Sequence, residues 1–361
     1  MTNFDPTGPT PPLPNRLHRA TSATAGHSPA ARGGDRLRPA RGLSHHLPPR
    51  ASPHTLRCMA FVGLEIGGTK LQMIVAETPF HVLNRKETRV EPAAGAEGIR
   101  QWIGRELPDL IRGHDVRAVG VGFGGPVHWK TGTVAQSHQI AGWAGFPLAE
   151  WIRTMVDVPV LVDNDANVAA LGEAWHGAGR AHDPVFYVTL GSGVGGGLVV
   201  GGRVYHGIPP GEAELGHLRL DRQGTTLESR CSGWAMNERV RQAVAAAPGT
   251  PLGRRVREDP GHEARHLAAA LAEGDPLAQR LLEEWAEDFA FGLSHAVHLF
   301  HPEIVILGGG LAGVGEPLRA AVARHLPRHL MNAFQPGPKL ALAALGRDAV
   351  PVGAIEMARW A

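Results

Sequence analysis

The chain has 361 residues, 43% of them hydrophobic, which is enough for the cores of two domains of ordinary size. Only two cysteines occur, which excludes a disulfide scaffold and a zinc site built mainly from thiolates. No run of 18 apolar residues occurs, so we expect no membrane span, and the few cysteines are typical of the reducing cytoplasm.

The formal net charge of +2 averages two unlike parts of the chain. Residues 1–58 hold eight arginines and two aspartates, which leaves 28 basic and 32 acidic side chains in the remainder. Nucleic-acid-binding domains are usually basic. The mildly acidic body therefore argues against a nucleic-acid partner.

The first 58 residues hold ten of the 29 prolines and show no helical or strand period, so we expect this segment to be disordered. Three interpretations stay open. It is a flexible tail, or the start of translation is set too early and Met59 is the true start, or it is a targeting peptide, although it lacks an apolar stretch. The prolines also argue against a winged-helix DNA-binding module there.

Beyond Phe61, short apolar strands alternate with helices. The strands are predicted at residues 61–66, 71–77, 118–123, 158–162, 185–190, 198–200, 203–205 and 304–307. Helices are predicted from Ile99 to Leu110, with Pro108 kinking or breaking the first, from about residue 167 to 175, and along a face containing Leu281, Trp285, Phe289 and Leu293. Alternating strands and helices in both halves predict an α/β fold with two similar domains and a cleft between them.

Three of the strands end in glycine-rich loops, at residues 67–70, 191–197 and 308–310. Such loops let backbone N–H groups approach an anion, and Thr69 and Ser192 add hydroxyl donors. None of the loops is a P-loop or a dinucleotide fingerprint. Tight hairpins without a ligand are the alternative, but three loops in a repeated fold favour phosphate binding.

An acidic and amide-rich segment, residues 163–167, directly follows a buried strand. Strand carboxyl ends are where α/β proteins place ligands, although a helix N-cap explains one of these residues equally well. A carboxylate here could accept the proton of an attacking hydroxyl. Residues 211–217 and Glu228 add carboxylates and an imidazole, which are suited to binding sugar hydroxyls.

Together these motifs resemble the ROK family (repressor, open reading frame, kinase), from Phe61 to Ala361. The matching segments are residues 65–70, 163–173, 190–197, 214–217 and 304–310. The resemblance implies two actin-like (ribonuclease H-like) domains, one of residues 59–177 plus 346–361 and one of residues 178–345. It also implies that the last helix, around residues 353–360, packs on the first domain, and that the protein is a homodimer.

The resemblance further implies ATP-dependent phosphorylation of a hexose hydroxyl, with glucose as the first choice of sugar. N-acetylmannosamine or fructose is the alternative within kinases, and a non-catalytic sugar-responsive regulator is the alternative of another class. Asp165 would be the general base. The residues that would bind the sugar are Asn164, Glu214, His217, Glu228 and Gln139. Those that would bind ATP are Gly67, Gly68, Thr69, Lys70, Gly191, Ser192, Gly193 and Gly309.

The chain departs from the family pattern at two places that bear on metals. Many members hold a structural zinc through one histidine and three cysteines, whereas residues 221–226 contain no cysteine here and Cys231 follows Glu228. We therefore expect no zinc, and His217 and Glu228 held by packing alone. Glu65 stands where the family usually has Asp, and its carboxylate would face Mg²⁺ through water. The extra methylene would shift that water by about an ångström, and a misplacement of this size can slow a reaction. The retained Asp165 argues against the non-catalytic alternative.

Overall fold

The computed structural model describes residues 59–361 except His138 and Glu212. The expected disorder of residues 1–58, and the alternatives for where translation starts, lie outside the described residues. No helix within the described ranges is both long and apolar enough to cross a membrane.

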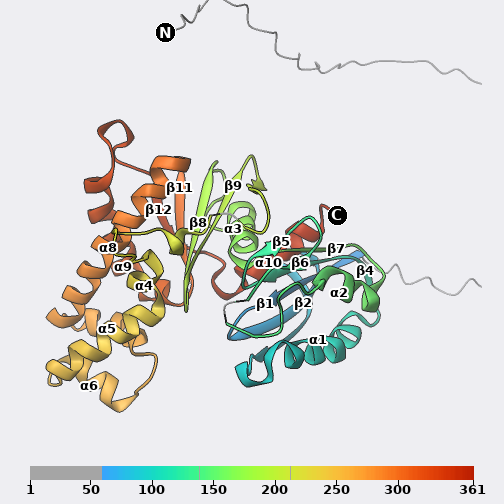
Figure 1. The fold of residues 1–361 in the computed structure, drawn as a ribbon, viewed down its shortest axis with the longest axis horizontal. Coiled ribbons are helices and arrows are strands. Elements are labelled where there is room, and N and C mark those ends of the chain that lie inside the picture. The colour runs from blue at the N-terminus through green and yellow to red at the C-terminus, as the bar shows by residue number, and fades with distance from the viewer. Residues whose placement is uncertain (1–58, 138, 212) are drawn as a thin grey trace, which may run out of the picture. The chain divides into compact units, whose positions relative to one another are not determined.

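Two five-stranded sheets with the same strand order organise the described chain (Figure 1). The first sheet contains β1 (Met59–Ile66), β2 (Lys70–Thr78), β3 (His81–Arg89), β4 (Asp115–Phe123) and β7 (Val160–Asn164) in the order β3-β2-β1-β4-β7. The second contains β8 (Val185–Leu190), β9 (Val194–Val200), β10 (Arg203–Val204), β11 (Ile304–Gly308) and β12 (Lys339–Leu342) in the order β10-β9-β8-β11-β12. In each sheet the first strand is central, antiparallel to the second and parallel to the fourth. This repeat confirms the predicted pair of similar α/β units.

Helices surround both sheets, and a small hairpin is formed by β5 (Val127–His128) and β6 (Thr133–Val134). The α-helices are α1 (Gly95–Ile111), α2 (Leu148–Val156), α3 (Asp165–His176), α4 (Leu227–Cys231), α5 (Gly233–Ala246), α6 (Pro251–Glu258), α7 (Leu267–Ala272), α8 (Pro276–Phe300), α9 (Glu316–His325) and α10 (Ala349–Ala358). The 3-10 turns are η1 (Pro92–Ala94), η2 (Leu215–His217), η3 (Glu263–His266), η4 (Leu311–Val314), η5 (Leu326–His329), η6 (Asn332–Phe334) and η7 (Gly346–Asp348).

Local predictions differ from the structure at several places, of which three are instructive. β3 was not predicted because its charged and polar residues lie on an exposed sheet edge, where apolar periodicity is absent. Pro108 does not break α1, since it lies in the last turn and the helix loses only one N–H donor there. β7 begins and ends two residues later than predicted, so that Asp163 and Asn164 belong to the strand itself.

The two helices α3 and α10 each follow a strand of one sheet and pack on the other sheet. α3 follows β7 of the first sheet and contacts β8 and β9 of the second, whereas α10 follows β12 of the second sheet and contacts β1 and β4 of the first. The return of the last helix to the first sheet is thus confirmed. The predicted apolar face of α8 is confirmed as well, since Trp285, Phe289 and Leu293 are fully buried in the core of the second half.

α3 and α10 cross at two glycines that permit very close contact. A Cβ on Gly353 would lie 1.8 Å from the carbonyl oxygen of Val168, and one on Gly172 would lie 2.5 Å from that of Ala349. Real Cβ atoms do not approach backbone so closely, so both positions require glycine. The spacing of the two helices, and with it the spacing of the two sheets, depends on these residues.

We predict that Gly353→Ala lowers the free energy of unfolding by at least about 2 kcal/mol, because the added methyl must push apart two packed backbones. The matched control is Gly104→Ala in α1, where an added Cβ meets nothing within 4 Å and should stabilise the helix by about 0.5–1 kcal/mol. Chemical denaturation of both variants measures the difference. Equal effects would contradict the role of the crossing.

Candidate functional site

The site is organised around the start of α3. Asn164 caps this helix, because its Oδ1 accepts hydrogen bonds from the N–H groups of Ala166 (2.9 Å) and Asn167 (3.3 Å). Its Nδ2 donates to the carbonyl of Gly125 at 3.2 Å. The N-cap alternative for the acidic segment therefore holds for Asn164, while Asp165 occupies the first turn and lines a cavity.

This inner cavity has a volume of about 580 Å³ and brings Asp165 together with Glu65. Its other lining includes Lys70, Thr189 and the glycine loop 308–310. Burial, together with the negative charges of Glu65 and Glu214, raises the pKa of Asp165 from 3.8 to about 7. A carboxyl with a pKa near neutrality is suited to accepting a proton at physiological pH.

Glu65 is held by two neighbours on β2. Lys70 pairs with its Oε2 at 2.9 Å, and Gln72 donates to the same oxygen at 2.5 Å. Lys70 also donates to the carbonyl of Arg347, in the turn before α10, at 3.0 Å. The lysine thereby joins the first glycine loop to the segment that leads into α10.

The residues of this cavity fit a magnesium ion that arrives with a nucleotide. Mg²⁺ is usually held by one or two carboxylates together with substrate phosphates and water. Glu65 and Asp165 face the same cavity, and their mutual repulsion raises the pKa of Asp165, so a cation there would be favoured. In the described ranges no group of three or more His, Cys, Asp or Glu side chains could hold a metal by itself.

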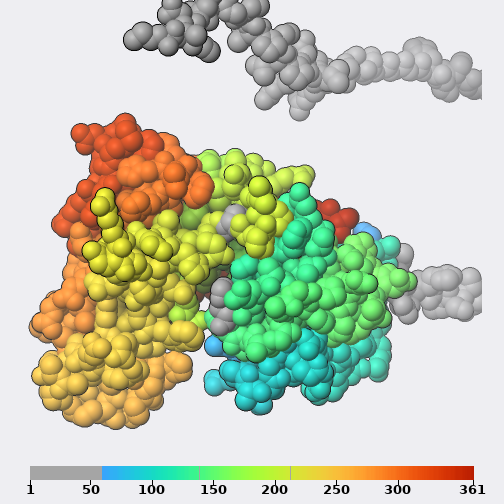
Figure 2. Space-filling model, viewed as in Figure 1, coloured from blue at the N-terminus to red at the C-terminus, as the bar shows by residue number. Residues whose placement is uncertain are grey.

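A larger cavity of about 970 Å³ lies beside the inner one and shares Lys70, Gly310 and Gly313 with it. Figure 2 shows the groove that separates the two halves on one face of the described chain. Of the predicted ATP-binding residues, those lining the larger cavity are Gly68, Thr69, Lys70, Gly191 and Ser192. Gly309 lines the inner cavity, whereas Gly67 and Gly193 line neither and form hydrogen bonds that close the two loops.

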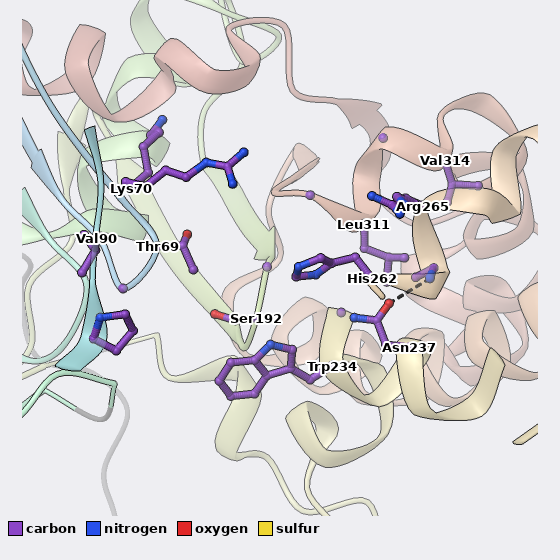
Figure 3. A pocket seen from close by; sticks show the side chains of 18 residues that line it. Thr69, Lys70, Val90, Ser192, Trp234, Asn237, His262, Arg265, Leu311 and Val314 are labelled. Atoms are coloured by element: carbon purple, nitrogen blue, oxygen red, sulfur yellow. Dashed lines mark hydrogen bonds between the residues drawn. The ribbon is translucent and has the colours of Figure 1, made fainter. Parts of the chain in front are cut away.

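The far wall of the larger cavity consists of residues that the sequence analysis missed (Figure 3). They include Trp234, Asn237, His262, Arg265, Leu311 and Val314. Trp234 leaves 61% of its surface exposed, which is unusual for so large an apolar side chain. Asn237 accepts a hydrogen bond from the N–H of Ala264 at 2.8 Å through Oδ1, which leaves its Nδ2 directed towards the cavity. The only sequence signal was the Gly233-Trp234 pair after Cys231.

The predicted sugar-binding residues lie near these cavities but line neither. Gln139 lies between the two phosphate loops: its Nε2 donates to Ser192 Oγ at 3.0 Å, and a Cβ on Gly68 would overlap its Oε1. Glu214 and His217 are exposed on and beside η2, and Glu214 is close enough to Asp165 to raise its pKa.

Glu228 connects the predicted sugar motif to the second phosphate loop. Its Oε2 accepts a hydrogen bond from the backbone N–H of Val194 at 2.9 Å. A Cβ on Gly193 would lie only 2.4 Å from the same oxygen, so the loop passes directly over the carboxylate. Glu228 therefore orients the loop whatever else it binds.

The expectation that packing alone holds this region is wrong. Backbone hydrogen bonds join Leu227 N–H to the carbonyl of Leu218 and Leu220 N–H to that of Thr225, both at 2.8 Å. Thr226 and Ser229 then form a reciprocal capping box at the start of α4. A hydrogen-bonded hairpin thus occupies the place that the family pattern gives to zinc.

Cys231 is not arranged as a metal ligand. The residue is fully buried, and this burial raises the pKa of its thiol to about 12. Since metals bind the thiolate, this thiol would have to give up its proton to bind one.

Comparison with known proteins identifies the chain's family. The model of the ROK family matches residues 61–360, so the chain belongs to this family. It is 31% identical to the glucokinase of Streptomyces coelicolor over 318 residues, covering 82% of this chain and 97% of that enzyme. It is 28% identical to the glucokinase of Halalkalibacterium halodurans over 307 residues, covering 81% of this chain and 93% of that enzyme.

A solved structure extends the likeness to three dimensions. The ROK family glucokinase of Streptomyces griseus, crystallised in complex with glucose and AMPPNP, is 32% identical and superposes with a TM-score of 0.74. The match covers 84% of this chain and all of that one. The two sheets are therefore the two actin-like domains of a ROK protein, as predicted.

Ala213, directly before Glu214, is held in the left-handed region with φ of 54°. That conformation costs an alanine about 1–2 kcal/mol, whereas glycine adopts it freely. We predict that Ala213→Gly is more stable than the matched control Ala144→Gly, an exposed loop position without a positive φ, by about 1–2 kcal/mol. Thermal unfolding measures both, and a control that is at least as stable would argue against strain at this loop.

The raised pKa of Asp165 makes a prediction about stability and pH. The folded chain binds this proton more tightly than the unfolded chain does. The free energy of unfolding therefore falls as pH rises from about 4 to about 7, and the whole loss is present above pH 7. Asp165→Asn removes this penalty and should stabilise the protein by on the order of 3 kcal/mol at pH 8 but little at pH 4.5. Thermal midpoints at both pH values test this, with Asp109→Asn, at an exposed position of α1, as control. A pH-independent gain in Asp165→Asn would show that its carboxyl titrates normally.

Proposed function

We propose that the protein is an ATP-dependent sugar kinase and that glucose, converted to glucose 6-phosphate, is its first-choice substrate. The observation that carries the proposal is the position of Asp165. This carboxyl, with a pKa near 7, lines a cavity that shares Lys70 with the large cavity between the glycine loops. The glucokinases named above, at 28–32% identity, support the same activity.

In the proposed reaction Asp165 accepts the proton of the sugar hydroxyl as that oxygen attacks the γ-phosphorus of ATP. The backbone N–H groups of the two glycine loops and the charge of Lys70 would hold the phosphates in line. Glu65 would hold Mg²⁺ through water, and the ion would supply neutralisation of charge on the transferred group. Closure of the two halves would exclude water from the phosphoryl group.

We assign the remaining residues as follows. Glu214 and His217 would bind sugar hydroxyls, and Glu228 would do so with Oε1 while Oε2 remains on Val194. Asn164 and Gln139 would contribute amide groups. Trp234 would stack on the nucleotide base, since an exposed indole face in a cavity is suited to a planar ring. The loop glycines predicted to bind ATP keep that assignment, Gly67 and Gly193 by shaping the loops.

We further propose that residues 59–177 plus 346–361 and residues 178–345 form the two domains, and that the protein acts as a cytoplasmic homodimer. Membership of the two sheets supports this division. That the protein needs no zinc stays a prediction, which metal analysis of the purified chain would test.

The test is ADP release by the full-length chain with Mg²⁺-ATP and a panel of glucose, mannose, fructose, N-acetylglucosamine and N-acetylmannosamine. We expect turnover to be fastest with glucose, and to fall below pH 7 because Asp165 becomes protonated. Asp165→Asn should lose activity by about a thousandfold or more, whereas Asp109→Asn should keep it.

Other outcomes decide between the alternatives. A preference for N-acetylmannosamine or fructose would replace glucose as the substrate while leaving the kinase assignment intact. A folded protein that gains thermal stability from a sugar but releases no ADP would replace the kinase with a sugar-responsive regulator.

A further inference from the structure

A buried carboxylate lies two residues before the proposed base. Asp163, at the end of β7, is only 4% exposed. Its Oδ1 accepts hydrogen bonds from the N–H of Asn164 at 2.7 Å and from Nδ2 of Asn167 at 3.1 Å. Both donors belong to the segment that starts α3, so Asp163 holds this segment in place through two hydrogen bonds.

The other oxygen of Asp163 is bound by a residue from the second half of the chain. Nε2 of His206 lies 2.7 Å from Oδ2 of Asp163. Since an ionised carboxylate only accepts hydrogen bonds, Nε2 must carry a proton and donate it. The indole of Trp129, from the turn between β5 and β6, stacks on the imidazole with ring centroids 4.2 Å apart and planes at 20°. His206 thus contacts two residues of the first half, Asp163 through a hydrogen bond and Trp129 through ring stacking.

The segment that contains His206 buries no side chain between residues 205 and 211. It follows β10 and leads to Glu214 and His217. None of residues 205–211 is buried, and Ile208 is 88% exposed. Because apolar burial does not hold this segment, its start is fixed by polar contacts: the hydrogen bond from Tyr205 N–H to the carbonyl of Leu198 at 2.8 Å and the contact of His206 with a buried carboxylate.

We propose that His206 is a positioning residue, which ties the loop carrying Glu214 and His217 to the segment carrying Asp165. The inference rests on the proposed function, because it assigns those residues to the sugar and the base. Removing the imidazole leaves Asp163 buried with one partner fewer and releases the loop, so that the sugar-binding side chains lose their place relative to Asp165.

The test compares three variants of the full-length chain. In His206→Ala we expect the KM for glucose to rise about tenfold or more and kcat to fall, while the KM for ATP changes less than about twofold. His206→Gln, which keeps an amide N–H donor for Asp163, should restore most of the loss. His176→Ala should leave both KM values unchanged.

His176 is the matched control because its pair with Glu356 is closely similar in kind. The His176–Glu356 pair spans 2.9 Å, with side chains 16% and 5% exposed, against 20% and 6% for His206 and Asp163. It joins α3 to α10 and is not part of the loop after β10. If His206→Ala and His176→Ala alter the kinetics alike, or if only the KM for ATP changes, the positioning role is overturned.

A second measurement does not depend on turnover. A glutamate-specific protease should cleave after Glu214 at least about tenfold faster in His206→Ala than in the native chain, and at the native rate in His176→Ala. If no sugar is phosphorylated by the native chain, the proposed function fails, and the cleavage rates still decide whether His206 holds the loop. Equal cleavage in His206→Ala and the native chain would overturn the tether.

Discussion

The close contact between α3 and α10 is the constraint on which the rest of the structure depends. Each helix follows the last strand of one sheet and packs on the other, and the two meet where Gly172 faces Gly353. A glycine in β4 also permits α10 to lie close to the first sheet, since a Cβ on Gly120 would lie 2.0 Å from the carbonyl of Ala354. Because these residues have no side chains, the backbones are in direct contact there, and this contact determines the distance between the two sheets.

The active-site geometry follows from that crossing. α3 begins with Asp165 at its N-terminus and carries Glu173, a fully buried residue, in its last turn. Glu173 accepts hydrogen bonds from Ala178 N–H in one connection between the sheets, and from Ala344 and Leu345 N–H in the other, at 2.8–3.1 Å. One helix therefore carries the proposed base and also binds both connections between the sheets.

Three acidic side chains lie close together in the site, and two of them raise the pKa of the third, Asp165. Glu65, Asp165 and Glu214 come from three separate parts of the chain, and the two outer charges help to keep the pKa of Asp165 near 7. Lys70 offsets part of this charge from one side by pairing with Glu65. An incoming cation and phosphate would complete the balance, which suits a site that transfers a charged group.

The local pattern of the sequence determined most strands of the two sheets, the glycine loops and the apolar face of α8, because period-2 and helical spacing and loop glycines act over a few residues. The charged edge strand β3 escaped, since an exposed edge needs no apolar pattern. Only the tertiary structure decided that Glu228 holds Val194, that Gln139 reaches Ser192 and that His206 reaches Asp163. These contacts join residues 34 to 53 positions apart, and their geometry is set by how the helices cross and the loops return, which no local periodicity encodes.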